Sequence, residues 1–308
     1  MSGPIQRPDL ECVDEVLAGI EIREGRRASV GGLDVVRVLP TKGRRTVGAW
    51  CFVDLAGPAD AEQPDPMEVG PHPHIGLSTV TWLLEGEALH TDSLGTEQVI
   101  RPGQLNLMTA GHGIAHAELA AQPPFRGVQL WVAQPEATRH GPSAFEHHEQ
   151  LPGVELDGGQ AMLLVGELDG QRAPTRADTE LLGAQLELTA GTTVLGVAPH
   201  HEHAVVPLDG RVRVGAEVIE PGWLALIPAG IDEVPIETRD RGARLLLLGG
   251  EPLGEPIQMW WNFVARDRAE IEEAFHAWQQ RTDRFGDVTS SLKRIEAPRP
   301  PWMGAGRR

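Results

Sequence analysis

The amino-acid sequence predicts an all-β protein with two similar β-domains and one C-terminal helix. The 308 residues include 36 glycines and 25 prolines, which are scattered between short apolar runs rather than arranged periodically. Such a distribution is typical of many turns between short strands. A thirteen-residue segment also occurs twice in the chain, which favours two copies of one β-domain.

The predicted strands of the N-terminal half are short runs rich in β-branched and aromatic residues. They cover residues 20–22, 34–39, 48–53, 78–84, 88–91 and 104–108. The fourth and fifth runs are separated by Glu85-Gly86-Glu87, a spacing typical of a β-hairpin.

The repeated segment spans Val99 to Gly111 and again Val218 to Gly230. Eight of its thirteen positions are identical without a gap, and the upstream turn at Gly86 has a counterpart at Gly210. We therefore expect a duplicated domain. The expected division is an N-terminal domain over 1–135, a connection over 136–160, a second domain over 161–258 and a helix with a tail over 259–308.

The predicted C-terminal helix begins after Asp267, a good N-cap residue with Glu270 three positions later. Its apolar residues recur at i, i+4 and i+7, which predicts one face that packs on a barrel. That face comprises Ile271, Phe275 and Trp278. We interpret the aromatic residues just before the helix as anchors for it rather than as ligand-stacking groups; they are Trp260, Trp261 and Phe263.

The composition excludes several classes of function. The formal net charge of −17 argues against nucleic-acid binding through a broad basic surface. Cys12 and Cys51 form no CxxC motif, so we expect no disulfide framework and a reducing, cytoplasmic location. The N-terminus lacks the apolar stretch of a signal peptide, and no apolar run approaches the ~20 residues of a membrane span.

Two short motifs carry the candidate chemistry: Pro71-His72-Pro73-His74 and His116-Ala117-Glu118. Each places two good metal ligands at i and i+2, and such residues point to the same face of a β-strand. Three imidazoles and one carboxylate from two strands would therefore face one divalent metal inside a β-barrel. Imidazole suits iron, copper, nickel and zinc, and Fe(II) with open positions could bind an organic chelator and dioxygen.

Other residues are weaker candidates. His90 lies on a strand that returns toward the site, where it would orient a ligand or pack as an ordinary barrel histidine. His112 lies in a glycine-flanked turn and is expected at the rim. Ser78 follows His74 by four residues. Apolar residues expected to form walls of a substrate cavity are Trp82, Leu84, Leu105 and Met108.

The second domain does not repeat these ligands. Transferred through the repeat, the four positions carry Gly196, Ala198, Pro235 and Glu237, so we expect no metal there. His200, His201 and His203 lie nearby; they would form a partial site if the alignment shifted, or a solvent-facing loop cluster.

Several runs of the sequence resemble those of a known family. The runs PHPHIGLSTVTWLLEGEALHTDSLG and RPGQLNLMTAGHGIAHAE are similar to those of the pirin family of the cupin superfamily, as is the later GEPLGEPI. The resemblance covers about residues 20 to 290 and implies two cupin barrels. It also implies one metal, usually iron, in the N-terminal barrel, with copper, nickel, manganese and zinc as alternatives. The matching ligands are His72, His74, His116 and Glu118.

The resemblance implies two functions of different classes. Some bacterial pirins resemble quercetin dioxygenases, for which the partners are a small aromatic substrate and dioxygen. In that chemistry Glu118 would be the general base as well as a ligand. Other pirins are iron-dependent, redox-sensitive regulators that bind a protein partner, and fold alone does not decide between the two.

The chain departs from the family pattern near the first motif. Pirins commonly read HPHRGFETV, whereas this chain has Ile75 and Ser78 where the arginine and glutamate stand. Many cupins take a carboxylate ligand at about the position of Ser78. Its hydroxyl is a poor substitute, which leaves Glu118 as the sole carboxylate of the set.

Overall fold

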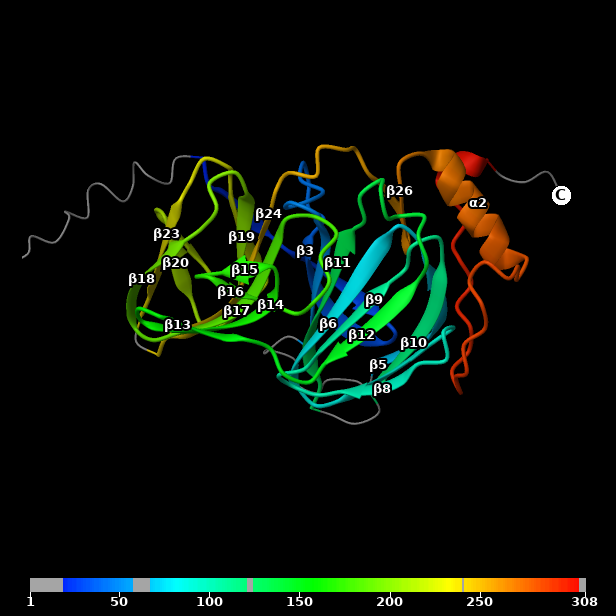
Figure 1. Cartoon of the computed structure of the whole chain (residues 1–308), viewed down its shortest axis with the longest axis horizontal. Coiled ribbons are helices and arrows are strands. Elements are labelled where there is room, and N and C mark those ends of the chain that lie inside the picture. The colour runs from blue at the N-terminus through cyan, green and yellow to red at the C-terminus, as the bar shows by residue number, and fades with distance from the viewer. Residues whose placement is uncertain (1–18, 58–66, 121–123, 240, 305–308) are drawn as a thin grey trace, which may run out of the picture.

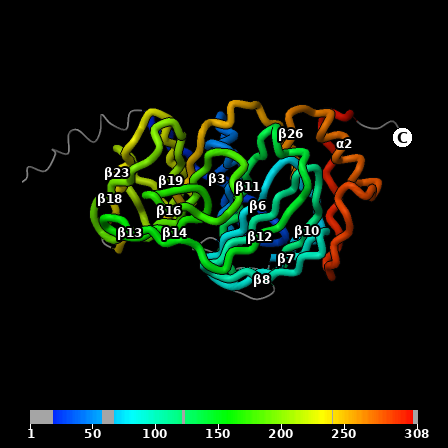
Figure 2. The backbone as a smooth tube through the Cα atoms, viewed as in Figure 1, coloured from blue at the N-terminus to red at the C-terminus, as the bar shows by residue number. Residues whose placement is uncertain are grey.

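Two β-barrels lie side by side along the long axis of the molecule, and one helix flanks the N-terminal barrel (Figure 1). The computed structural model describes residues 19–57, 67–120, 124–239 and 241–304. Each barrel consists of one seven-stranded and one four-stranded antiparallel sheet. The smooth backbone trace gives the same division into two barrels (Figure 2). The predicted all-β fold with two β-domains is confirmed.

The N-terminal barrel is built almost entirely from the first half of the chain. Its seven-stranded sheet has the order β12 (Ala144–His148), β9 (Leu105–Thr109), β6 (Leu77–Glu85), β11 (Arg126–Ala133), β4 (Trp50–Ala56), β3 (Leu33–Leu39) and β2 (Arg26–Val30). Its four-stranded sheet has the order β5 (Met67–His74), β10 (Ile114–Ala120), β7 (Ala88–Asp92) and β8 (Glu97–Ile100).

The C-terminal barrel repeats this arrangement. Its seven-stranded sheet has the order β1 (Glu21–Glu24), β22 (Trp223–Ile227), β19 (Glu202–Asp209), β24 (Ala243–Gly250), β17 (Leu181–Leu188), β14 (Gly159–Val165) and β13 (Gly153–Leu156). Its four-stranded sheet has the order β18 (Gly191–Gly196), β23 (Glu233–Thr238), β20 (Val212–Val214) and β21 (Glu217–Ile219). Two-stranded ribbons are β15 (Glu167–Leu168) with β16 (Gln171–Arg172), and β25 (Gln258–Trp260) with β26 (Phe263–Ala265).

Two segments join the barrels more closely than the sequence suggested. The first strand, β1, pairs with β22 of the second barrel, although it precedes the whole N-terminal barrel in the chain. The segment 136–160, expected as a connection, contains β12, which pairs with β9, and β13, which pairs with β14. The domain limits drawn from the sequence stay a prediction.

The largest apolar core lies between the two seven-stranded sheets. Because strand side chains alternate between faces, one face of each sheet contributes to this core and the other lines a barrel. On β11, for example, Val128 and Leu130 belong to the core between the barrels, whereas Gln129 and Trp131 line the cavity of the N-terminal barrel. The side chain of Trp50 reaches from the N-terminal barrel to the C-terminal barrel, where its indole Nε1 donates to the carbonyls of Leu182 (3.0 Å) and Gly249 (3.2 Å).

The interiors of the barrels differ in chemistry. The C-terminal barrel is filled by a buried aliphatic cluster to which β17, β19, β22 and β24 all contribute, for example through Leu186, Val205 and Leu247. In the N-terminal barrel, the interior face of the matching sheet carries polar residues, among them Thr81 and Asp54. This difference leaves space for a site in the first barrel.

The sequence repeat corresponds to a repeated turn. Gln104 N donates to the carbonyl of Arg101 at 3.1 Å, and Trp223 N donates to the carbonyl of Glu220 at 3.0 Å. The third turn residue, Gly103 in one copy, has a φ of 84°. A residue in that conformation is almost always glycine, which explains why Pro-Gly is kept in both copies.

The C-terminal helix is α2 (Arg268–Gln279), and it is capped as the sequence predicts. The Asp267 side chain accepts from Glu270 N, and the predicted apolar face is buried. With Phe263 and Phe285 this face forms a cluster against Ile75 and Ala115 of the N-terminal barrel. Beyond α2 the chain runs back along β5 to a 3-10 turn at Pro301–Met303, with Ile295 N donating to the carbonyl of Pro71 at 2.9 Å.

Candidate metal centre

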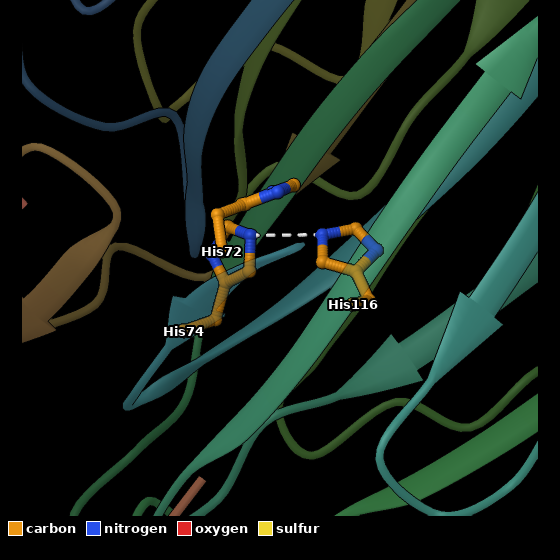
Figure 3. Close-up of side chains that lie close together, drawn as sticks. All are labelled: His72, His74 and His116. Atoms are coloured by element: carbon orange, nitrogen blue, oxygen red, sulfur yellow. Dashed lines mark hydrogen bonds between the residues drawn. The ribbon is translucent and has the colours of Figure 1, made fainter. Parts of the chain in front are cut away.

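The two histidine motifs lie on neighbouring antiparallel strands, β5 and β10. His116 is registered opposite His72, and Ile114 opposite His74. The register shifts between His116 and Glu118, whose partner is Val69, so β5 carries one extra residue there. Such bulges re-aim side chains and are common beside active sites. The bulge lies between the histidine pair and Glu118, and the regular register on its other side lets the side chains of His72, His74 and His116 converge (Figure 3).

The three imidazoles are close enough to share one ion. The ligand atoms of His72, His74 and His116 all lie within 4.8 Å of one another, and the Nε2 atoms of His74 and His116 are 3.0 Å apart. All three side chains are buried. This histidine-rich site could therefore hold a metal ion, as the spacing of the motifs predicts.

Hydrogen bonds fix the orientation of two of the rings. His72 Nδ1 lies 2.9 Å from the carbonyl of Gly70, which only a protonated nitrogen can satisfy, so its Nε2 carries the lone pair. His116 Nδ1 lies 3.4 Å from His90 Nδ1, and His90 Nε2 lies 3.2 Å from Asp92 Oδ2.

The remaining oxygen of Asp92 is also held. Its Oδ1 accepts from the backbone N–H groups of Leu94 (2.9 Å) and Thr96 (3.0 Å). If His90 donates from Nε2 to Asp92, its Nδ1 accepts from His116, which leaves His116 Nε2 as a free lone pair. This arrangement fits the orienting role expected for His90, which stays a prediction.

Burial keeps the imidazoles neutral. It lowers the pKa of His72 to about 4, although the Gly70 carbonyl partly opposes this. Burial, together with the neighbouring histidines, lowers the pKa of His74 and His116 well below the usual value. Neutral imidazole is the form that binds metals.

Glu118 lines the same cavity as the three histidines. It forms a second possible ligand group with His90 and His116, in which all ligand atoms again lie within 4.8 Å of one another. Burial raises the pKa of Glu118, and the nearby His90 and the Thr81 hydroxyl oppose that shift. The Thr81 Oγ1 donates to Glu118 Oε1 at 3.3 Å. A buried carboxylate adjoining the histidines is thus available either to the ion or to a substrate proton.

A cavity of about 390 Å³ opens onto this cluster. Its aromatic wall is the stacked pair Phe52 and Trp131, with ring centroids 4.0 Å apart, and Trp131 also contacts His74 edge-on at 5.2 Å. A partly buried ion pair of Arg37 and Asp54 forms another wall, with N–O distances of 2.7 Å and 2.6 Å. Cavities that combine aromatic and polar walls are typical of small-molecule sites.

Several residues expected around the site lie elsewhere. Trp82, Leu84 and Leu105 belong to the core between the barrels, and Trp82 Nε1 donates to Gln185 of the second barrel at 2.8 Å. These residues lie on the faces of β6 and β9 that point away from the cavity. On β6, Trp82 and Leu84 alternate with Thr81, which faces the site. Met108 is buried in a small cluster of its own, with Ala110, Ile114 and Phe145.

Ser78 and His112 also lie apart from the histidine cluster. The Ser78 hydroxyl donates to Thr109 Oγ1 at 3.3 Å. His112 lies at a surface pocket with Arg139, Glu270 and Arg284, so its expected place at the rim of the site is not what the structure shows.

Some cavity residues were missed from the sequence. Thr79 and Thr81 alternate with apolar residues on β6, a signal that could have placed them facing the site. The sequence predicts Trp261 only as an anchor for the C-terminal helix. In the structure it packs near α2 and also lines the cavity. Arg37 and Asp54 are seventeen residues apart and meet only through the β3–β4 pairing, so no local pattern predicted them.

The corresponding region of the second barrel carries no equivalent group. By strand register, Val194 and Gly196 of β18 correspond to His72 and His74, two residues earlier than the sequence repeat suggested. The side chain of Glu237 pairs instead with Arg213 and Arg239. His200 is exposed as expected, whereas His201 and His203 are buried, contrary to the prediction of a solvent-facing cluster.

Comparison with known proteins agrees with this architecture. The family description "Pirin" matches residues 32–132, and "Pirin C-terminal cupin domain" matches residues 183–286. A Pseudomonas aeruginosa protein named "Putative quercetin 2,3-dioxygenase PA1205" is 48% identical over 311 residues, covering 98% of both chains. This chain belongs to the pirin family.

Other pirin relatives extend the comparison. A pirin-like protein of Caulobacter vibrioides is 38% identical over 276 residues, covering 86% of this chain and 94% of the relative. A crystal structure of quercetin 2,3-dioxygenase from Acinetobacter baumannii superposes with a TM-score of 0.85 and 41% identity, covering 92% of this chain and 96% of that one. The fold is thus the two-barrel cupin fold of pirins. Within the part of the chain that the structure describes, no helix has the length and apolar character to span a membrane.

Proposed function

We propose that this pirin is a metal-dependent dioxygenase that acts on flavonol-like aromatic enols such as quercetin. The observation that carries the proposal is the group of three buried histidines with Glu118 at the end of an aromatic-walled cavity. The dioxygenase names of the 48% and 41% identical relatives support the same reaction class.

The proposed ligands are His72, His74, His116 and Glu118, and the proposed ion is Fe(II). The donor set fits such an ion, because three neutral imidazoles and one carboxylate suit divalent iron and leave room for further ligands. When bound, a redox-active ion with open positions would supply the activation of dioxygen and of the substrate's enol oxygen.

The chain's own residues would bind and orient the substrate. The Phe52–Trp131 stack presents an aromatic face on which a planar ring system can lie. The Arg37–Asp54 pair offers polar atoms to hydroxyl groups at the far end of the substrate. Both interactions would fix the ring with its enol hydroxyl toward the histidines.

Glu118 is the proposed general base. Its carboxylate faces the cavity and has one hydrogen bond, from Thr81, which leaves acceptor capacity for the enol proton. Thr81 would hold that carboxylate in place, and its hydroxyl also contacts Gln129 Oε1 at 3.2 Å.

The experiment is an oxygen-electrode assay with quercetin after anaerobic loading of the full chain with Fe(II). We expect oxygen and quercetin to be consumed together by the wild type, and the rate to fall at least a hundredfold in Glu118→Gln, which removes the base. Wild-type protein that binds iron yet consumes neither compound would overturn the dioxygenase proposal. That result would favour the other class of function, a metal-binding regulator with a protein partner.

A further inference from the structure

A second cluster of metal-binding side chains lies in the C-terminal barrel, outside the site described above. Glu180 precedes β17, and His200 and His201 precede β19. Their ligand atoms all lie within 4.8 Å of one another. None of the three corresponds to a ligand position of the N-terminal barrel, because those positions are Val194 and Gly196 on β18 and their partners on β23.

One carboxylate oxygen faces both imidazoles. Glu180 Oε2 is 2.8 Å from His200 Nε2 and 3.2 Å from His201 Nε2. Two ligands of one tetrahedral Zn²⁺, each about 2.0–2.1 Å from the ion, stand about 3.3–3.4 Å apart. Small side-chain movements would therefore convert these hydrogen bonds into a shared coordination site.

Backbone hydrogen bonds hold two of the three ligand residues in position. Glu180 accepts from Glu251 N through its carbonyl at 3.2 Å, and His201 N donates to the carbonyl of Ala198 at 3.0 Å. The His201 side chain is 11% exposed, whereas the other two are more than half exposed, so an ion can reach the cluster from solvent. A ligand set with an open side is typical of transition-metal sites that keep one position for water or another exchangeable ligand.

A buried histidine beside the cluster is a second, independent observation. His203 is 1% exposed, and neither of its ring nitrogens has a hydrogen-bond partner. Buried polar atoms are rarely left without partners, so an unpartnered imidazole points to a ligand or a bound group. Its ring centroid is 5.9 Å from that of His201.

We propose that Glu180, His200 and His201 form a second binding site for a divalent transition-metal ion such as Zn²⁺. The site joins the segment before β17 to the segment before β19, and the buried imidazole of His203 lies next to it. Three protein ligands leave the fourth position to solvent, so the site is exchangeable rather than closed.

The test is Zn²⁺ binding by the full chain, measured by equilibrium dialysis with elemental analysis after treatment with a chelator. We expect two ions per wild-type chain and one in a His200→Ala/His201→Ala variant. We also expect one Zn²⁺ ion per chain in a His74→Ala/His116→Ala variant. A variant that carries all four substitutions should bind no Zn²⁺ ion tightly. The result is independent of quercetin turnover, so it separates this site from the proposed activity.

The matched control is another histidine–carboxylate pair, Glu146 and His148, which are 3.0 Å apart. A Glu146→Gln/His148→Ala variant should keep both ions, because one imidazole and one carboxylate are too few ligands. Glu180→Gln, which keeps the shape of the side chain, should weaken the second site at least tenfold without unfolding the barrel. If wild type and His200→Ala/His201→Ala bind equal numbers of ions with equal affinity, the proposal is overturned.

Discussion

The Nε2 atoms of His74 and His116 face each other at 3.0 Å across two strands of the N-terminal barrel. Two imidazole nitrogens at this distance repel unless a proton or a cation lies between them. A metal with ligands at about 2.1 Å and right angles places two such nitrogens about 3.0 Å apart. The β5–β10 register, which sets His116 opposite His72, therefore gives the spacing that one ion needs.

Removing one of these two nitrogens should abolish tight binding at the N-terminal site. We expect His116→Ala to weaken iron binding at least a hundredfold, because one of three buried imidazoles is lost. Isothermal titration with Fe(II) under anaerobic conditions would measure this. His112→Ala is the control, since His112 lies at a separate surface pocket and should bind iron as the wild type does.

The His90–Asp92 pair should tune the same site without contacting the ion directly. Asp92→Asn keeps the Oδ1 that caps Leu94 and Thr96 but replaces the oxygen that faces His90. Loss of such an orienting carboxylate typically costs 10–100-fold in metal affinity. We expect a decrease in that range with an unchanged melting temperature of the metal-free protein. Unchanged affinity would mean that His90 does not orient His116.

Gly70 should be intolerant of any side chain because the C-terminal segment crosses it. A Cβ there would lie 2.0 Å from the carbonyl oxygen of Lys293. We expect Gly70→Ala to loosen residues 286–304, with faster hydrogen exchange of the Ile295 N–H, and to disturb His72, whose Nδ1 bonds to the Gly70 carbonyl. Gly196→Ala in β18 is the matched control, since a Cβ there meets nothing within 4 Å.

Trp50 should contribute to stability through the contact between barrels. Trp50→Phe leaves the carbonyls of Leu182 and Gly249 without their indole donor in a buried position. We expect the free energy of unfolding to fall by about 1–3 kcal/mol in urea titrations. Trp260→Phe removes a hydrogen bond from the indole to the carbonyl of Pro298 at an exposed site, so the free energy of unfolding should fall by less. An equal decrease in the free energy of unfolding in the two variants would argue against a stabilising contact between the barrels at Trp50.

Cys51 should be inert in the folded protein. Burial raises the pKa of its thiol to about 12, so the reactive thiolate is scarce at pH 8. In a Cys12→Ser background, we expect no iodoacetamide labelling of native protein by mass spectrometry and complete labelling in denaturant. Rapid labelling of the native form would show that the barrel opens around β4.

Much of the fold was readable from local patterns. The repeat of Val99–Gly111 at Val218–Gly230 predicted a duplicated β-domain from eight identical positions of thirteen. The structure explains its Pro-Gly turn, because Gly103 and Gly222 both have a positive φ. The cap at Asp267 and the apolar face of α2 followed from spacing alone. The pairing of β1 with β22 of the second barrel was not predictable, because no local pattern within Glu21–Glu24 indicates so distant a partner strand.

The site was predictable where ligands share a strand and less so where they do not. The i and i+2 spacing identified His72 with His74 and His116 with Glu118. Trp82 lies on the opposite face of β6 from Thr81, and its apolar character alone fits either the core between the barrels or a cavity wall. Glu180 was missed because only the tertiary fold brings it to His200, twenty residues away.

The most direct test of the central claim is anomalous diffraction at the iron edge from crystals grown with Fe(II). The account predicts one strong peak in the N-terminal barrel, about 2.1 Å from the Nε2 atoms of His72, His74 and His116. Absence of a peak between these histidines, with iron present elsewhere in the crystal, would contradict it.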